Sequence, residues 1–205
     1  MSIPLNFLGG ISFDEFIPAW AKKRIEIGVP IEAVMLISVG ELNENKNNQV
    51  IVRALGKLKD RNVHYVLCGV GNKEPELKAL VQEVGVANNV HFLGYRTDVK
   101  ELMNTSDIFV MPSIREGLSR SIMEAMASGL PCVVSRIRGN VDLVKDGENG
   151  YVVEADDVVS FTEKMGELIR DEGLRTRMTE RNLRRIKDFN IETVKDRIGK
   201  IYRES

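Results

Sequence analysis

Two glutamates, Glu116 and Glu124, flank the start of a predicted helix, and this arrangement could hold a ligand that carries both phosphate and hydroxyl groups. An apolar strand-like run ends at Pro112, Gly117 follows in the loop, and a helix is expected to begin near Ser119. A glycine lets a ligand approach the backbone, and the free N–H groups of a helix's first turn attract anions. Carboxylates accept hydrogen bonds from hydroxyl groups. The segment therefore predicts a diphosphate pocket with a carboxylate on either side.

The position of Glu124 supports this prediction but has a second interpretation. Five residues inside the helix, Glu124 lies roughly 7 to 8 Å along the axis at about 1.5 Å per residue. Sugar hydroxyls on both sides of a diphosphate would match the two carboxylates, and a nucleotide sugar has that layout. However, Ser121 to Glu124 also fits a capping box, in which Glu124 only satisfies the helix start. Glu116 could similarly be a solvated loop charge.

The elements around this loop follow a regular alternation. Runs that are typical of strands are Val34 to Val39, Val63 to Cys68, Val90 to Leu93, Ile108 to Met111, Cys132 to Val134 and Tyr151 to Val153. Segments with helical spacing separate them. Strand followed by helix, repeated, predicts the α/β class: a Rossmann-like doubly wound parallel sheet of about six strands with helices on both faces. Such sheets bind ligands beyond the carboxyl ends of their strands, where the Glu116 loop is expected.

Three regions are predicted along the chain. Residues 1–33 do not fit the alternation and are interpreted as an interdomain linker with a leading helix. Residues 34–187 form the predicted Rossmann-like domain that binds a nucleotide sugar. Residues 188–205 are predicted to form a C-terminal helix, whose apolar residues need a surface to pack against.

Composition argues against several classes of protein. The 205 residues, 43% of them hydrophobic, can bury one substantial core. The 29 Lys and Arg residues nearly balance the 30 Asp and Glu residues, so no nucleic-acid partner is expected. No apolar run approaches the roughly 18 residues of a membrane span. The start lacks the features of a signal peptide, so a cytoplasmic location is expected.

Other chemically versatile residues receive structural interpretations. Cys68 and Cys132 lie in apolar strand-like runs and are expected in the core. His64 and His91 lack a cluster of neighbouring ligands, so core or edge roles are expected and no metal site is predicted. The pair Asp156-Asp157 precedes a helix, where carboxylates favour the helix dipole.

The motif with Glu116 and Glu124, separated by seven residues and followed by Ala125 to Pro131, resembles the donor-binding motif of retaining glycosyltransferases with the GT-B architecture of two Rossmann-like domains. The similarity is to glycosyltransferase family 4, or group 1, which includes bacterial capsule and lipopolysaccharide enzymes. Further segments that match the family in order and spacing are Ser38 to Leu42 with Lys46, Cys68 to Gly71, Val90 to Tyr95, Asp107 to Ser113, Gly139-Asn140 and Asp146 to Gly150. The resemblance covers about residues 34–203.

The resemblance implies a role for each residue of a donor site. Lys46 and Glu116 are implied to be catalytic, with Lys46 on the phosphates and Glu116 near the sugar, while Glu124 would bind the ribose. Gly117 to Ser119 would give backbone N–H groups to the diphosphate, and Gly94 to Arg96 would edge the nucleobase. The full set implied to contact the donor is Gly40, Lys46, Gly71, Tyr95, Arg96, Glu116, Gly117, Leu118, Ser119, Arg120 and Glu124.

One position departs from the family pattern. Where many relatives carry an arginine after the glycine of the first loop, this chain has Glu41. Two like charges about 4 Å apart repel by about 1 kcal/mol in water and by several times more when partly buried. We therefore expect Glu41 to turn away from the phosphates and Arg120 to supply the positive charge. The alternative for Arg120 is an ordinary exposed helix residue.

The reaction implied by the resemblance is transfer of a sugar from a nucleotide diphosphate sugar, UDP- or GDP-linked, to a hydroxyl acceptor with retention of configuration, in surface polysaccharide biosynthesis. No metal or other cofactor is implied. The acceptor would bind to an N-terminal domain absent from this chain, toward which the final helix would pack, so the chain alone is expected to be inactive. Residues from Arg181 to Lys187 are predicted to form a solvated helix face that could contact another domain or an anionic membrane surface. Peripheral association with the inner face of the membrane is the corresponding expectation for the full-length enzyme.

The sequence also bears on three other functions. A nicotinamide dehydrogenase needs a three-glycine fingerprint, but Gly40 to Glu44 contains one glycine, and Glu74 stands where a third glycine would follow Gly69 to Gly71. A non-catalytic module that binds nucleotide sugars stays open, although the intact motif residues argue against it. Nucleotide-sugar epimerases of similar two-domain build resemble residues 116–131 less well.

Overall fold

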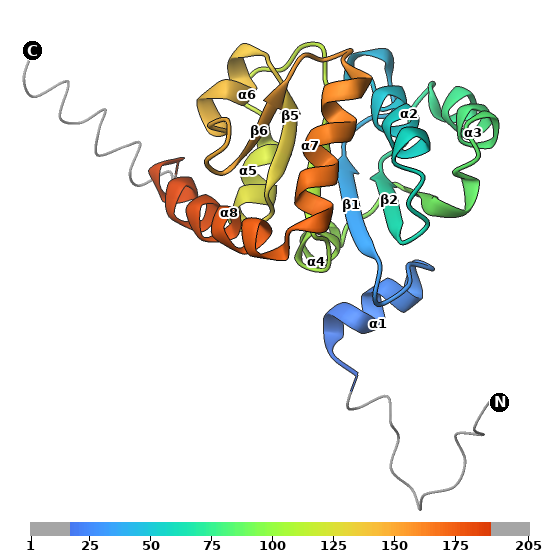
Figure 1. Ribbon diagram of the computed structural model, residues 1–205, viewed down its shortest axis with the longest axis horizontal. Coiled ribbons are helices and arrows are strands. Elements are labelled where there is room, and N and C mark those ends of the chain that lie inside the picture. The colour runs from blue at the N-terminus through green and yellow to red at the C-terminus, as the bar shows by residue number, and fades with distance from the viewer. Residues whose placement is uncertain (1–16, 190–205) are drawn as a thin grey trace, which may run out of the picture.

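The fold is a six-stranded parallel sheet with helices on both faces, seen in a computed structural model that describes residues 17–189 (Figure 1). The strands are β1 (Val34–Val39), β2 (Val63–Cys68), β3 (Val90–Gly94), β4 (Ile108–Met111), β5 (Cys132–Ser135) and β6 (Gly150–Val153). Their order is β3-β2-β1-β4-β5-β6, and every neighbouring pair is parallel. The predicted Rossmann-like fold class is confirmed, and each predicted strand boundary is right to within one residue.

The strand order places a topological switch point between β1 and β4. From β1 the chain builds outward to β3 on one side, and from β4 it builds outward to β6 on the other. Ligands bind such sheets where the connections diverge, at the carboxyl ends of the two central strands. The loops that follow β1 and β4 are the ones that contain Lys46 and Glu116.

Eight α-helices and three short 3-10 helices occur within residues 17–189. They are α1 (Ala19–Glu26), η2 (Glu44–Lys46), α2 (Gln49–Leu58), α3 (Glu74–Glu83), η3 (Ala87–Asn89), α4 (Val99–Asn104), α5 (Arg120–Ala127), α6 (Arg138–Leu143), α7 (Val158–Arg170), α8 (Glu172–Arg185) and η4 (Ile186–Phe189). Side chains of α2, α3 and α7 form one hydrophobic core, and those of α4, α5 and α6 form the other. Both faces of the sheet are therefore covered, which explains why the strands read as continuous apolar runs.

Helix α1 is fixed to the sheet domain by a buried arginine. The Arg24 guanidinium donates hydrogen bonds to the carbonyl oxygens of Thr105 (3.0 Å) and Ala33 (2.5 Å), and it pairs with the Asp107 carboxylate at 2.7 Å. The same carboxylate accepts a hydrogen bond from the Met35 amide at 2.7 Å. The leading helix predicted within residues 1–33 is thus present as α1, and Arg24 anchors it to the sheet domain. The earlier part of the predicted linker, residues 1–16, lies outside the described residues.

Helix α8 is held to the domain by buried amides and by arginines. Asn182 donates to the carbonyl oxygens of Leu130 and Asn149, both at 2.8 Å, and accepts from the Asn149 side chain at 2.7 Å. Arg181 and Arg185 also donate to backbone carbonyls of the same domain. The helix face from Arg181 to Lys187, which was predicted to be solvated, therefore also makes hydrogen bonds within the domain. Of the helix predicted for residues 188–205, only 188 and 189 are described, in η4, and the rest lies outside the described residues.

The structural interpretations of the two cysteines, the two histidines and Asp157 are confirmed. Cys68 and Cys132 are buried free thiols, and burial raises the pKa of Cys68 to about 12. His64, on β2, and His91, on the edge strand β3, contact each other through Nδ1 and Nε2 at 2.9 Å. Asp157 caps α7 by accepting a hydrogen bond from the Ser160 amide at 3.0 Å.

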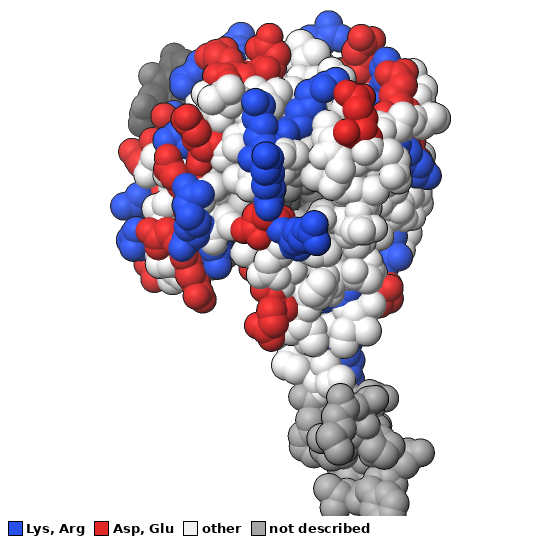
Figure 2. Space-filling model, turned by 45° about the vertical axis from the view of Figure 1, so that its right-hand side comes forward, with Lys and Arg blue, Asp and Glu red and all other residues white. Residues whose placement is uncertain are grey.

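The surface carries charges of both signs. Figure 2 shows Lys and Arg side chains interspersed with Asp and Glu side chains over the visible face of the domain, in keeping with the formal net charge of −1. None of the helices in residues 17–189 has the length and apolar character required to cross a membrane.

Candidate functional site at the carboxyl ends of β1 and β4

The loops after β1 and β4 are joined by backbone and side-chain hydrogen bonds. The Ile114 amide donates to the Asn45 carbonyl at 2.8 Å, and the Asn45 side chain donates to the Arg115 carbonyl at 2.8 Å. These two bonds hold η2 against the segment that leads into Glu116. The two loops therefore form one surface at the switch point.

Lys46 and Glu116 meet across this surface. The Lys46 ammonium lies 2.5 Å from the Glu116 carboxylate, and the two side chains are only 19% and 17% exposed. Gly40 makes room for the lysine, because a Cβ there would lie 3.0 Å from Lys46 Cε. Its φ of +147° is also a conformation that side-chain-bearing residues rarely adopt. Gly40 thus positions Lys46, and the structure brings the two residues implied to be catalytic into direct contact.

Helix α5 begins at Arg120 with Ser119 as its N-cap, which agrees with the predicted start near Ser119. The Ser119 side chain is the N-cap and accepts a hydrogen bond from the Ile122 amide at 3.4 Å. The alternative capping box of Ser121 and Glu124 is therefore wrong, because Glu124 lies five residues beyond the N-cap rather than three. Its carboxylate, 42% exposed, instead pairs with Arg120 Nε at 3.0 Å.

Helix α6 packs closely against the Glu116 loop. A Cβ on Gly139 would lie 2.6 Å from the Gly117 carbonyl carbon and 3.2 Å from the Glu116 carbonyl oxygen, so only glycine allows this approach. Gly117 itself has open space around it, and Leu118 is exposed. Two fully buried polar atoms, Ser113 Oγ and Asn140 Oδ1, have no hydrogen-bond partner within the described residues. The Glu116 loop therefore packs tightly against α6, beside these two buried polar atoms.

The loop after β2 approaches the site through glycines. A Cβ on Gly71 would lie 2.5 Å from the Leu42 carbonyl carbon, and the Leu42 amide donates to the Val70 carbonyl at 3.0 Å. Gly71 was predicted to contact the donor. The structure gives it a packing role, in which it lets the loop after β1 lie against the loop after β2.

Tyr95 and Arg96 border a separate cavity at the same end of the sheet. This cavity has a volume of about 350 Å³, mainly apolar walls, and a lining of Val39, Gly40, Glu41, Cys68, Gly69, Val70, Tyr95, Arg96 and Val99. Tyr95 is 79% exposed. Arg96 is held by the carboxylates of Asp98 (2.7 and 2.6 Å) and Glu26 (2.8 Å), and the hydrogen bond from Arg96 is the main cause that lowers the pKa of Asp98. Arg96 thus ties the loop after β3 to α1.

Glu41 and Arg120 both have partners among nearby side chains. The exposed Glu41 carboxylate accepts a hydrogen bond from the Asn43 side chain at 2.9 Å. Arg120 is 88% exposed and contacts Glu124. The expectation that Arg120 replaces the usual arginine at position 41 stays a prediction.

Comparison with known proteins adds to this geometry. Residues 21–185 match the family model described as glycosyl transferases group 1. The chain belongs to this glycosyltransferase family. Its similar proteins include the lipopolysaccharide core biosynthesis glycosyltransferase LpsE of Rhizobium meliloti, which is 32% identical over 161 residues, with 78% of this chain and 47% of LpsE covered.

The chain is also similar to a second relative and to a solved structure. The UDP-Gal:alpha-D-GlcNAc-diphosphoundecaprenol alpha-1,3-galactosyltransferase of Escherichia coli is 29% identical over 201 residues, covering 94% of this chain and 52% of that enzyme. The crystal structure of Anabaena HepE in complex with UDP superposes with a TM-score of 0.84 at 23% identity, covering 91% of this chain and 53% of HepE. This glycosyltransferase chain therefore spans about half the length of the relatives that it matches.

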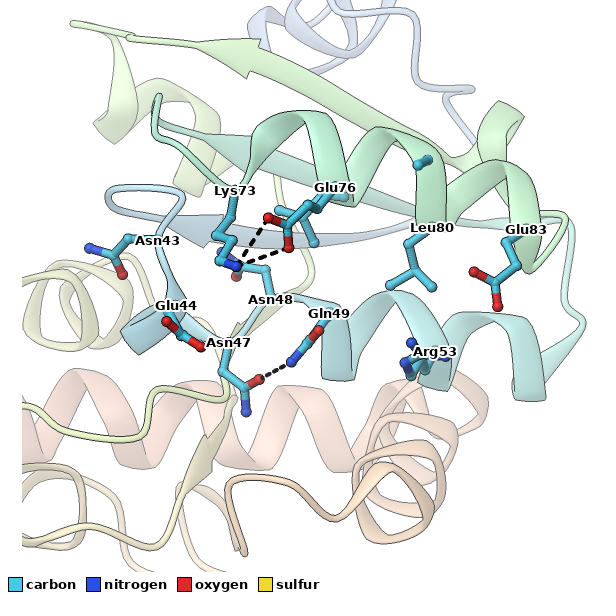
Figure 3. Close-up of a pocket in the computed structure, with 12 residues that line it drawn as sticks. Asn43, Glu44, Asn47, Asn48, Gln49, Arg53, Lys73, Glu76, Leu80 and Glu83 are labelled. Carbon is cyan, nitrogen blue, oxygen red and sulfur yellow. Dashed lines mark hydrogen bonds and ion pairs between the residues drawn. The ribbon is translucent and has the colours of Figure 1, made fainter.

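A second cleft lies between α2 and α3 (Figure 3). Its volume is about 330 Å³, and its lining is Asn43, Glu44, Asn47, Asn48, Gln49, Arg53, Lys73, Glu76, Leu77, Ala79, Leu80 and Glu83. The Lys73 ammonium is bound by Glu76 at 2.9 Å, and Gln49 donates to Asn47 at 3.1 Å. The residues implied to contact the donor do not line this cleft.

The structure brings together most of the predicted site residues. Lys46 and Glu116 are in contact, and Arg120 and Glu124 form a second pair on the first turns of α5. Sequence reasoning missed the supporting roles of Asn45 and Gly139, because their partners lie far away in the chain. Among residues 17–189, no three His, Cys, Asp or Glu side chains form a group suited to a metal ion.

Proposed function

We propose that this glycosyltransferase domain binds the diphosphate of a nucleotide sugar at the N-terminus of α5 and takes part in transfer of the sugar to a hydroxyl acceptor with retention of configuration. The observation that carries the proposal is the contact of Lys46 with Glu116 beside that N-terminus. A cation, a carboxylate and the first N–H groups of a helix, which lack partners within the helix, converge there. This combination suits a diphosphate joined to a hydroxyl-rich group.

The proposed roles follow from the charges. When the sugar leaves, negative charge grows on the diphosphate, and Lys46, the α5 N-terminus and Arg120 stabilise it without a metal ion. Glu116 accepts hydrogen bonds from the sugar, and Glu124 accepts them from the ribose. The apolar cavity beside Tyr95 would hold the nucleobase. The complex of HepE with UDP supports a UDP-linked donor first, with a GDP-linked donor as the second candidate.

We further propose that the pathway is surface polysaccharide biosynthesis, supported by the lipopolysaccharide enzyme LpsE among the relatives. Since the chain spans about half the length of these relatives, the acceptor would bind to a second domain, and the chain alone would not complete the transfer.

The test is calorimetric titration of the chain with UDP, GDP and ADP, first without and then with magnesium. One nucleotide is expected to bind without magnesium, and Glu124→Ala should weaken its binding at least about tenfold, or about 1.4 kcal/mol. Glu76→Ala, which removes a carboxylate from the cleft between α2 and α3, is the matched control and should bind like the wild type. Binding that requires magnesium, or that is insensitive to Glu124→Ala, would contradict the proposal.

A further inference from the structure

We propose that Glu116 takes Lys46 back from the spent nucleoside diphosphate and thereby promotes its release. This inference rests on the proposed function, because it assigns a second role to a residue of the same site. It starts from the contact between the Lys46 ammonium, which would bind phosphate, and the Glu116 carboxylate.

The pair is protected from solvent and held in place on both sides. Both side chains are more than four-fifths buried, so water and salt screen their attraction less than at an exposed surface. Asn43 accepts a hydrogen bond from the Lys46 amide at 3.1 Å, and Asn45 joins η2 to the loop before Glu116. The lysine and the glutamate therefore meet in this arrangement of the two loops.

A nucleotide sugar and a nucleoside diphosphate present different groups to this pair. With the intact donor, Lys46 turns to the phosphates while sugar hydroxyls donate to Glu116, so both charges keep a partner. After transfer the hydroxyls leave with the sugar. Within residues 17–189, the side chain that donates to the Glu116 carboxylate is Lys46, and a partly buried carboxylate without a partner is costly. Its return to Lys46 removes a cation from the nucleotide and weakens the hold on it.

The neighbouring pair on α5 is not suited to the same role. Arg120 is 88% exposed and Glu124 is 42% exposed, and exposed ion pairs are weak and screened by salt. The effect on release is therefore assigned to Glu116 alone.

The experiment is titration of the full chain with the nucleoside diphosphate that the wild type binds, by calorimetry for affinity and by stopped flow for the dissociation rate. Glu116→Gln keeps the shape of the side chain but removes the charge that holds Lys46. Its affinity should rise at least about fivefold, mainly through slower dissociation. Glu44→Gln removes a carboxylate from the same short helix as Lys46 and is the matched control, with an affinity expected within about twofold of the wild type.

Each outcome bears on the inference. An affinity of Glu116→Gln equal to or below that of the wild type would overturn it, and so would an equal gain for Glu44→Gln, which would indicate general charge repulsion. Both results leave the donor-binding proposal standing if Glu124→Ala still weakens binding. If the wild-type chain binds none of the nucleoside diphosphates, the proposed function fails and this inference fails with it.

Discussion

Replacement of Gly139 by alanine should damage the donor site from a position outside it. The added Cβ would clash with the Gly117 carbonyl oxygen and lie 2.6 Å from the Gly117 carbonyl carbon, whereas unstrained carbon atoms approach to about 3.5 to 4.0 Å. The start of α6 and the Glu116 loop must therefore separate by at least about 1 Å. Overpacking of this size costs about 1 to 3 kcal/mol. A glycine-to-alanine change inside a helix would otherwise stabilise the protein by about 1 kcal/mol. A decrease in the free energy of unfolding would therefore indicate the clash.

Two measurements test Gly139→Ala. Urea unfolding should show a loss of stability, and calorimetric titration should show nucleoside diphosphate binding at least about tenfold weaker, because displacements of about 1 Å can cost up to 10²-fold in a preorganised site. Gly117→Ala is the matched control for stability, since a Cβ there meets no other atom within 4 Å. A Gly139→Ala variant as stable as the wild type, with unchanged nucleotide affinity, would refute the supporting role of α6.

Three further predictions concern catalysis, stability and pH. In an enzyme that joins this chain to the proposed acceptor-binding domain, Lys46→Ala should lower turnover at least about tenfold, or about 1.4 kcal/mol of barrier. Unchanged steady-state turnover would refute the role of Lys46. Arg24→Met should destabilise the domain by roughly 3 kcal/mol in urea unfolding, because Asp107 loses its cation and the Thr105 and Ala33 carbonyls lose a donor. A change as small as that of a surface substitution would contradict the role of Arg24 as an anchor. Burial is the main cause that lowers the pKa of both His64 and His91 below 6.5, so the unfolded chain binds more protons than the folded one. The free energy of unfolding should therefore fall as the pH drops from about 7.5 through 6.5. His91→Gln should reduce this pH dependence, and an unchanged slope of unfolding free energy against pH would exclude the histidines as its source.

Local patterns were sufficient to predict the strands and the start of the key helix. All six strands are apolar runs bounded by turn residues, and burial on both faces of a parallel sheet produces that pattern directly. Ser119 was predicted near the helix start from the loop that precedes it. The competing Ser121 to Glu124 pattern is also local, but Ser119 adopts an extended conformation and already occupies the N-cap.

Contacts between distant segments could not be predicted in the same way. Nothing near Asn45 indicates that its side chain will bind the Arg115 carbonyl, and nothing near Gly139 indicates that it will touch Gly117. Nothing in the sequence around Arg24 indicates its burial, yet its side chain lies among backbone carbonyl groups. Such pairings depend on which loops the strand order brings together, and periodicity carries no information about them.

The most direct test of the central claim is a map of backbone amide chemical shifts of the ¹⁵N-labelled chain during titration with its preferred nucleoside diphosphate. If the nucleotide binds at the switch point, the largest chemical-shift changes are expected at Lys46 and at residues 117–119, which lie just before the first turn of α5. Changes centred instead on Gln49 and Leu80, in the cleft between α2 and α3, would place the nucleotide elsewhere and contradict the account.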